Sequence, residues 1–227
     1  MAMASLEQKA AQENVSYVIQ NLRAVYGIPE RSITRKPLDE LILTILSQST
    51  TNINSNRTFS RLKSRFTSWD EARMADRAEI EEAIKSGGLA KQKSGRIKSI
   101  LSEIHSRTGE TSLDFLCELD VPRASAFLSS LKGVGPITVA CTLLFGCGRA
   151  VFPVDVHIMR IASRLGLISE RCTDSEAHRI LAAAVPAENY YEAHINMIRH
   201  GREICRPRAP KCETCCLVDY CEFYRPL

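Results

Sequence analysis

The sequence is poor in aromatic residues and contains no apolar run long enough to cross a membrane. Aromatic residues make up 6% of the chain, and Trp69 is the single tryptophan among 227 residues. The longest apolar stretch, around 139–145, is interrupted by Thr142 and followed by Gly146, whereas a membrane-spanning helix needs about 20 apolar residues. The opening M-A-M-A-S-L-E-Q-K has no basic lead followed by an apolar segment, as a secretion signal would have. We therefore expect a cytoplasmic protein, nucleoid-associated if it is bacterial, with no membrane partner.

The sequence also lacks the alternating apolar pattern of β-strands, internal repeats and low-complexity segments. Apolar residues recur instead at helical spacing, and glycine and proline separate the periodic segments. The segment 39–48, D-E-L-I-L-T-I-L-S-Q, is apolar on nearly all sides, as expected for a central buried helix. We predict an all-α fold, with further helices at 6–25, around 59–66, and at 79–85, 93–107, 112–118, 122–131, 136–146, 154–165, 175–184 and 188–204.

Charge of neither sign dominates the chain. The formal net charge is +4, which permits nucleic-acid binding without requiring it. The cations are unevenly spread, because five lie between Lys85 and Lys98 with no acidic residue, and five more lie between Arg199 and Lys211 against the single Glu203. Such runs are most often solvated faces, so they indicate nucleic-acid binding only when they are tied to a site.

Nine cysteines in a chain without a secretion signal argue against a disulfide framework. Four of them are scattered among apolar residues, and we expect these to be small core residues: Cys117, Cys141, Cys147 and Cys172. The remaining cysteines cluster near the end of the chain.

The clustered cysteines have the spacing of metal ligands. Cys205, Cys212, Cys215 and Cys221 are separated by six, two and five residues, and four thiolates on so short a loop can converge on one metal centre. Zinc accepts four thiolates, but its ligands usually come as two close pairs separated by a longer loop. One close pair flanked by single cysteines fits a four-thiolate iron–sulfur cluster better, and we interpret the adjacent Cys216 as a bystander.

A glycine hairpin lies about seventy residues before this tail, at L-K-G-V-G-P-I-T-V-A (131–140). Glycines allow a tight turn between two helices, and proline suits the first position of the second helix. Amides at the start of that helix would form an anion site suited to one phosphate oxygen. The alternative is a tight corner between helices that binds nothing.

Asp155 follows the hairpin in P-V-D-V-H (153–157). An aspartate at the start of a helix is most often an N-cap, although a capping aspartate can also face a cleft. His157 is more often a structural hydrogen-bonding partner than a catalyst.

Two further stretches could meet a ligand. The polar stretch 47–56, S-Q-S-T-T-N-I-N-S-N, which includes Gln48, is either a helix-capping loop or a surface that faces a base or a sugar-phosphate. Leu89 lies at the tip of the turn S-G-G-L-A-K-Q-K, surrounded by cations. Such a leucine usually packs back against its own turn, but an apolar wedge that enters a duplex step is the alternative.

Taken together, these motifs resemble the endonuclease III family of base-excision DNA glycosylases, in the helix-hairpin-helix superfamily with a Gly/Pro-rich loop and a catalytic aspartate. The hairpin, V-D-V-H-I-M-R and C-x6-C-x2-C-x5-C carry the resemblance, which spans roughly residues 15 to 225. It implies a six-helix barrel domain at 30–149 and a cluster domain made of 1–29 and 150–227. It also implies a monomer that binds double-stranded DNA containing a damaged or mismatched base.

The resemblance assigns roles to the candidate residues. Asp155 would be catalytic and would stabilise the cationic sugar that forms as the base departs. Leu89 would fill the gap left by a flipped nucleotide. Gly133, Val134 and Gly135 would bind a backbone phosphate through their amides, and Lys132, Gln48 and His157 would also contact DNA. The four tail cysteines would hold a 4Fe-4S cluster.

One position departs from the family pattern. In members that also nick the strand, a lysine lies two residues beyond the second hairpin glycine and attacks the sugar as an amine. Ile137 occupies that position here, which favours a monofunctional glycosylase that leaves the abasic site intact. Adenine excision is disfavoured, because the helix at 41–46 lacks the acidic residue of adenine-excising members. A glycosylase/AP lyase that uses a displaced lysine and acts on oxidised pyrimidines, and a non-catalytic damaged-DNA-binding protein, are the alternatives.

Overall fold

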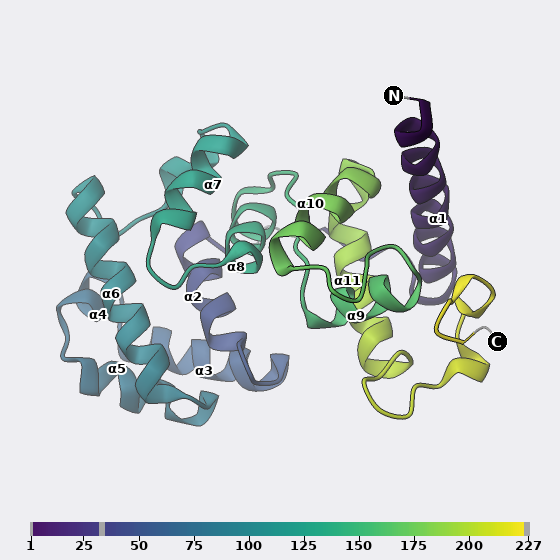
Figure 1. Ribbon diagram of the computed structural model, residues 1–227. Coiled ribbons are helices and arrows are strands. Elements are labelled where there is room, and N and C mark those ends of the chain that lie inside the picture. Colours follow the sequence, from purple (N-terminus) through teal and green to yellow (C-terminus); the bar gives the residue numbers. More distant parts are fainter. Residues whose placement is uncertain (1, 32–34, 225–227) are drawn as a thin grey trace. The chain divides into compact units, whose positions relative to one another are not determined.

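The computed structural model describes residues 2–31 and 35–224, with side chains described from residue 14 onward. Within these ranges the regular elements are helices and no strand occurs, which confirms the all-α prediction (Figure 1). The chain divides into an inserted unit, 33–149, and a terminal unit formed by both chain ends, 1–32 and 150–227. Among the described helices, none is both long and apolar enough to traverse a lipid bilayer.

The inserted unit is built around one buried helix. That helix, α2, contacts α3, α6, α8 and the turn after α8, and the side chains of Leu41, Ile42 and Ile45 are fully buried. This burial on several sides is what its continuous apolar pattern predicts. The α-helices of the unit are α2 (Pro37–Ser47), α3 (Asn52–Arg65), α4 (Trp69–Met74), α5 (Arg77–Ile84), α6 (Ala90–Thr108), α7 (Val121–Ser130) and α8 (Pro136–Cys141), with short 3₁₀ turns at Lys85–Gly87 and Asp114–Cys117.

The second half of the amide-rich stretch 47–56 is helical, because α3 begins within it. The hydroxyl of Thr51 accepts a hydrogen bond from the N–H of Asn54 at 3.3 Å, so Thr51 caps α3 and the helix begins at Asn52. The capping interpretation of this stretch is therefore correct for its second half. Only 48–51 is left as a loop between α2 and α3.

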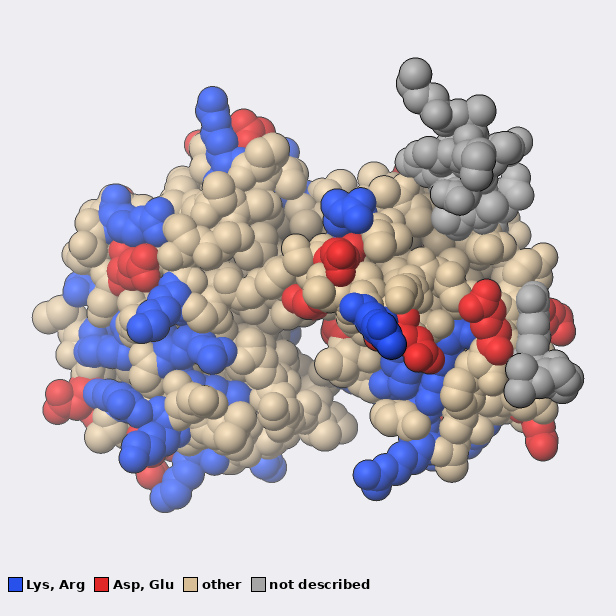
Figure 2. All heavy atoms as spheres, in the orientation of Figure 1, with Lys and Arg blue, Asp and Glu red and all other residues tan. Residues whose placement is uncertain are grey.

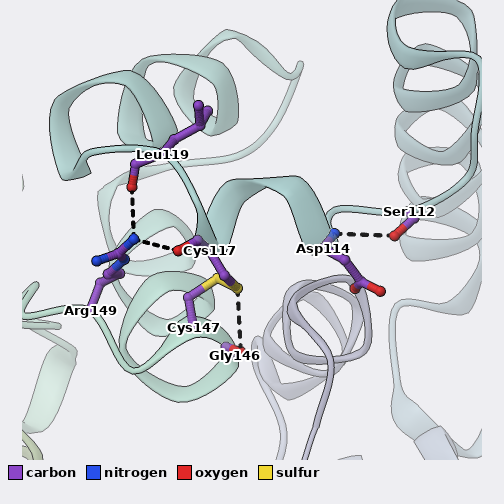
Figure 3. Close-up of a disulfide and its surroundings, with 7 residues drawn as sticks. All are labelled: Ser112, Asp114, Cys117, Leu119, Gly146, Cys147 and Arg149. Atoms are coloured by element: carbon purple, nitrogen blue, oxygen red, sulfur yellow. Dashed lines mark hydrogen bonds between the residues drawn. A yellow bond between two sulfur atoms is a disulfide. The ribbon is translucent and has the colours of Figure 1, made fainter.

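A disulfide in the inserted unit corrects the sequence-based interpretation of two cysteines. Cys117, at the end of a 3₁₀ turn, is bonded to Cys147, which follows the π-helical turn Thr142–Gly146 that continues α8 (Figure 3). Arg149 reinforces the same junction by donating to the carbonyl oxygens of Cys117 and Leu119. The two cysteines are 30 residues apart, so only the fold brings them together, whereas Cys141 is a buried residue outside the disulfide, as expected.

The terminal unit joins the two ends of the chain. Its α-helices are α1 (Ala2–Tyr26), α9 (Val156–Arg164), α10 (Asp174–Ala184) and α11 (Tyr190–Glu203), followed by 3₁₀ turns at Cys212–Thr214 and Val218–Tyr220. α1 packs on α10 and α11, and Arg23 binds both carboxylate oxygens of Glu192 at 2.7 Å. The four cysteines of the tail and Asp155 therefore belong to the same unit.

Candidate functional site

The hairpin of the inserted unit joins α7 to α8 by a tight turn. Gly133 adopts a positive φ of 85°, which favours glycine, and Gly135 caps α8 in an extended conformation. Lys132 and Gly133 are exposed, whereas the side chain of Val134 is buried. The N–H of Val134 donates to the carbonyl oxygen of Leu131 at 3.1 Å. The turn itself therefore uses the Val134 amide, and a phosphate contact through the amides of Gly133, Val134 and Gly135 stays a prediction.

Arg96 links this hairpin to the loop after α2. A Cβ atom on Gly133 would lie 2.9 Å from Nε of Arg96, so the arginine side chain packs on the glycine. Nη1 of the same arginine donates to Oε1 of Gln48 at 2.8 Å. The structure thus brings Gln48 and the hairpin together through Arg96, a residue that the sequence marks only as one cation of a basic run.

Leu89 has an unusual backbone for a leucine. Its φ of 52° and ψ of 33° are left-handed, it immediately precedes α6, and its side chain is 54% exposed. A left-handed conformation costs a non-glycine residue about 1–2 kcal/mol, and such strain concentrates at functional sites. Leu89 is therefore presented outward and not packed back against its own turn, as an apolar wedge requires.

Lys93 does not contribute to a phosphate-binding surface. Its side chain is buried, and Nζ donates to the carbonyl oxygens of Leu46 at 2.8 Å and Gly87 at 3.1 Å. Burial lowers the pKa of this ammonium, and the neighbouring Arg96 lowers it further. Lys93 therefore braces the loops that carry Gln48 and Leu89, which the run of cations in the sequence did not reveal.

The rest of the basic run 85–98 is also partly engaged. Nζ of Lys98 donates to the carbonyl oxygens of Arg73 and Ala75, and Lys85 pairs with Glu82 at 3.2 Å. Lys91 is exposed. Figure 2 shows lysine and arginine side chains spread over the face of the inserted unit that is drawn. The basic surface is thus real, but fewer residues of the run build it than the sequence suggests.

Asp155 is the N-cap of α9 in the terminal unit. Its Oδ1 accepts the N–H groups of His157 and Ile158, both at 2.9 Å, which satisfies two of the free donors at the start of the helix. Oδ2 accepts no hydrogen bond from the described residues, and the side chain is half-buried. Capping therefore uses one carboxylate oxygen and leaves the other available to a ligand.

His157 packs within the unit. Nη2 of Arg160 lies 3.0 Å from its Nδ1, and the same arginine donates to the carbonyl oxygens of Gly201 and Cys205. A Cβ atom on Gly201 would lie 2.8 Å from Cβ of His157, so α9 and α11 approach closely here. Burial is the main cause that lowers the pKa of His157. These contacts support a structural role, and a DNA contact of His157 stays a prediction.

The four tail cysteines lie on one loop after α11. Cys205 and Cys221 both raise the pKa of Cys212 and of Cys215 in addition to burial, so the four thiols are within electrostatic reach of one another. The pKa of Cys215 rises to about 11, mainly through burial. Among the described residues, no three cysteine, histidine or acidic side chains are already arranged to hold a metal ion.

Protein side chains hold this loop in place. Nη1 of Arg164 lies 3.3 Å from Sγ of Cys205 and 2.8 Å from the carbonyl oxygen of Arg206. His200 lies between Tyr26 and Cys215, with Nδ1 3.2 Å from the tyrosine hydroxyl and Nε2 3.4 Å from the cysteine sulfur. The four thiols of this loop match the donor type and number that a four-thiolate cluster requires.

The fold and these sites define an all-helical protein with a helix-hairpin-helix turn, an aspartate after it and a cysteine-rich tail. Residues 42–187 match the model of the HhH-GPD superfamily of base excision DNA repair proteins, and the chain belongs to this family. It is 32% identical to an endonuclease III of Thermotoga maritima over 201 residues, 88% of this chain and 90% of that protein. It is 38% identical over 165 residues to an Arabidopsis thaliana protein named as a putative DNA glycosylase, covering 73% of this chain but only 56% of the relative.

Solved structures show the same fold. An endonuclease III in a non-covalent complex with DNA aligns with a TM-score of 0.81 at 24% identity, covering 94% of this chain and 96% of that one. A thermostable thymine-DNA glycosylase aligns with a TM-score of 0.76 at 22% identity, covering 97% of this chain and 98% of that one. Similarity to the endonuclease III fold, expected from the motifs, is therefore confirmed.

Proposed function

We propose that this protein is a monofunctional DNA glycosylase of base-excision repair, which flips a damaged or mismatched base out of duplex DNA and hydrolyses its glycosidic bond. The observation that carries the proposal is the divided carboxylate of Asp155. One oxygen is fixed by the cap of α9, and the other accepts no hydrogen bond from the described residues. Family membership and the DNA-bound endonuclease III with the same fold support duplex DNA as the partner.

The chemistry follows from what each group offers. An enzyme that cuts a glycosidic bond in a duplex must extrude the nucleotide, at a cost of a few kcal/mol. The exposed Leu89 would fill the space that the flipped nucleotide leaves. The free oxygen of Asp155 would face the sugar as it becomes cationic, and it would guide a water molecule to the vacated carbon. Lys132 and the hairpin amides of Gly133 and Gly135 would hold a backbone phosphate.

Ile137 is the reason for proposing hydrolysis without strand cleavage. It is the second residue of α8, it is half-buried, and its hydrocarbon side chain cannot form a Schiff base. Lys93 is not a substitute nucleophile, since it is buried between two carbonyl oxygens. A glycosylase/AP lyase would therefore need another lysine, and Lys132, which is exposed in the hairpin, is the candidate nearest in sequence.

Cys205, Cys212, Cys215 and Cys221 would hold a 4Fe-4S cluster, whose proposed role is to cross-link the loop that contains Arg206 and Lys211. The iron–sulfur assignment predicts a brown protein that absorbs visible light, whereas zinc would give a colourless one. We also propose a monomer located in the cytoplasm, or with the nucleoid in a bacterium.

Base release from a panel of duplexes, each with one defined lesion or mismatch, tests the function. Strand breaks should appear only after alkali, and borohydride should trap no covalent protein–DNA adduct. An adduct would replace the proposal with the lyase alternative. Specific binding to a lesion without base release from any duplex would favour the non-catalytic alternative. Full base release by Asp155→Asn would instead overturn the catalytic role of Asp155.

Two substitutions of Asp155 separate its effect on stability from its effect on base release. Asparagine is as good an N-cap as aspartate, whereas alanine at a cap costs about 1 kcal/mol. Asp155→Asn should therefore unfold like the wild type, and Asp155→Ala should be less stable by about that amount. Both should lose base release by a factor of about 10² or more, because the negative charge is gone. Urea denaturation and single-turnover base release would be measured on the same preparations.

A further inference from the structure

The Pro153–Val154 peptide, which lies one residue before Asp155, is held between two histidine side chains. Its carbonyl oxygen, on Pro153, lies 3.0 Å from Nδ1 of His194, which donates to it. Its N–H, on Val154, donates to Nε2 of His178 at 3.1 Å. Both polar groups of one peptide unit are thus held by imidazoles that come from two different helices, α10 and α11.

These bonds determine whether the bonded ring nitrogen of each histidine carries a proton. Nε2 of His178 accepts the Val154 N–H, so it carries no proton, and the proton on Nδ1 is donated to the carbonyl oxygen of Asp174 at 2.8 Å. His194 must carry a proton on Nδ1 to donate to Pro153. His194 is buried, and burial lowers its pKa most, while the charge of Asp155 raises it and Arg202 and His178 lower it. The hydrogen bonds therefore fix an unprotonated Nε2 on His178 and a protonated Nδ1 on His194.

The arrangement fixes the chain on both sides of the carboxylate. Upstream, the histidines hold the 153–154 peptide, and Pro153 and Val154 are themselves buried. Downstream, the N–H groups of His157 and Ile158 hold Oδ1. Catalytic groups need to be held within about 0.5 Å of their working position, and a displacement of about 1 Å can cost 10²-fold in rate. Both histidines come from positions distant in sequence, so the fold supplies this constraint.

We propose that His178 and His194 are positioning residues, which set the place of the Asp155 carboxylate by holding the Pro153–Val154 peptide from both sides. This inference rests on the proposed catalytic role of Asp155. Neither histidine touches the DNA in this proposal. The expected consequence is that loss of either imidazole weakens recognition of positive charge on the sugar more than it weakens binding of DNA as such.

The test uses two synthetic duplexes and needs no knowledge of the natural lesion. One contains a pyrrolidine in place of the target sugar, which is protonated and imitates the cationic sugar, and the other contains a neutral tetrahydrofuran. The ratio of their dissociation constants reports how well the carboxylate is placed. We expect the wild type to prefer the cation by about 100-fold, and Asp155→Asn to bind both duplexes about equally.

The histidine variants are chosen by hydrogen-bonding ability. His178→Leu and His194→Leu remove the bonds, and each should reduce the preference for the cation about tenfold, with binding of the neutral duplex changed less than about threefold. His178→Gln keeps an acceptor and His194→Asn keeps a donor, so both should stay within about threefold of the wild-type preference. His105→Leu, which removes a histidine of the inserted unit, is the matched control. It should leave the preference for the cationic duplex unchanged.

The outcomes separate the two proposals. If Asp155→Asn keeps the preference, the catalytic role of Asp155 is wrong, and the positioning role fails with it. If Asp155→Asn loses the preference but His178→Leu keeps it, the positioning role alone is overturned. Equal losses for both duplexes would show a purely structural role and would also overturn it. Thermal unfolding of each variant is measured as a folding control. If His194→Leu does not fold, the result for His178→Leu alone tests the positioning role.

Discussion

Leu89 separates the demands of stability from those of function at a single residue. Its left-handed backbone is unfavourable for leucine, whereas glycine and asparagine adopt this conformation readily. Leu89→Asn and Leu89→Gly should therefore keep the free energy of unfolding within about 1 kcal/mol of the wild type or raise it. Base release should fall in both, because neither side chain fills the gap of a flipped nucleotide.

The control for this prediction is Ile53, another exposed apolar residue of the inserted unit, at the start of α3. Ile53→Asn should leave base release unchanged. If base release falls equally in Leu89→Asn and Ile53→Asn, the loss is not specific to position 89. Leu89 would then not be a specific wedge. Denaturation curves and single-turnover assays measure the two effects.

At the scale of residues, the sequence identifies those functional candidates that belong to a local motif. Asp155 was recognisable as a cap from its place before a helix, and Ile137 from its spacing to the hairpin glycines. Arg96, His178 and His194 could not be found in this way, since each acts on a segment that is distant in sequence. Lys93 was misleading, because a charged residue in a basic run gives no sign that its ammonium is buried against carbonyl oxygens.

The first turn of α2 carries a carboxylate that should make the inserted unit sensitive to pH. Glu40 is buried, and desolvation raises its pKa to about 7, with Asp39 adding to the rise and Arg35 opposing it. A carboxyl group whose pKa is raised by folding stabilises the fold at low pH, and this contribution is lost as pH rises from about 4.5 to about 7. The inserted unit should therefore lose about 3 kcal/mol over that range.

Glu40→Gln removes the titration and should flatten this dependence. Trp69 lies in the inserted unit and is the chain's single tryptophan, so its fluorescence follows this unit during urea unfolding. Titration curves of stability that stay parallel for wild type and Glu40→Gln between pH 4 and pH 8 would contradict the assignment.

The Cys117–Cys147 bond connects the turn before α7 with the end of the α8 region, across a separation of 30 residues. In the chain-entropy description, closing a loop of this length stabilises the fold by about 3–4 kcal/mol. Dithiothreitol should therefore lower the unfolding midpoint reported by Trp69. The double variant Cys117→Ser/Cys147→Ser should already unfold at the lower midpoint and should not respond to the reductant.

Cys172→Ser is the matched control for the bond, because Cys172 is a free cysteine of the terminal unit. It should respond to dithiothreitol like the wild type. Counting alkylated thiols by mass spectrometry before and after reduction gives an independent check. Two additional alkylations after reduction are expected if the bond is present, and none would contradict it.

At the scale of elements, helix positions followed from apolar periodicity and its interruptions. The starts of α3 and α9 are set by side-chain caps at Thr51 and Asp155, which is local chemistry that a sequence displays. The change from α-helix to a π-helical turn at Thr142 was not predictable, because that segment has the apolar pattern of an ordinary helix. The disulfide contradicted expectation, since the pairing of two distant cysteines is a property of the fold.

For the whole molecule, the number of lysines in the sequence overstates how many ammonium groups are available to the phosphates of DNA. Lys93 and Lys98 direct their ammonium groups to backbone carbonyls, whereas Lys91 and Lys132 are exposed. DNA affinity should fall steeply with salt, with about 0.9 lost from the slope of log K against log salt for each phosphate contact removed. Lys91→Gln and Lys132→Gln should each reduce the slope by that amount.

Lys98→Met is the comparison for the salt series. It should leave the slope unchanged while lowering stability, since two carbonyl oxygens lose a donor. A slope that does not change in Lys91→Gln or Lys132→Gln would remove these residues from the DNA surface. Fluorescence anisotropy of a labelled duplex at several salt concentrations measures all of the variants.

Global architecture was the level at which the sequence was most informative. Helical periodicity predicts an all-α fold, and the resemblance of three spaced motifs to a known family implies the endonuclease III type. The structure and the family match agree with both. The lesion is a different matter, because the shape of a base pocket depends on side chains whose contacts are set by tertiary structure and not by motif spacing.

The capped state of Asp155 has a thermodynamic consequence. A free aspartate on a surface samples several rotamers, and a reaction that needs only one of them must restrict the side chain at the moment of bond cleavage. Here two backbone N–H groups hold Oδ1 as soon as α9 forms. The rotational entropy of the carboxylate is therefore lost during folding, so for the proposed reaction none of it needs to be lost again at the transition state.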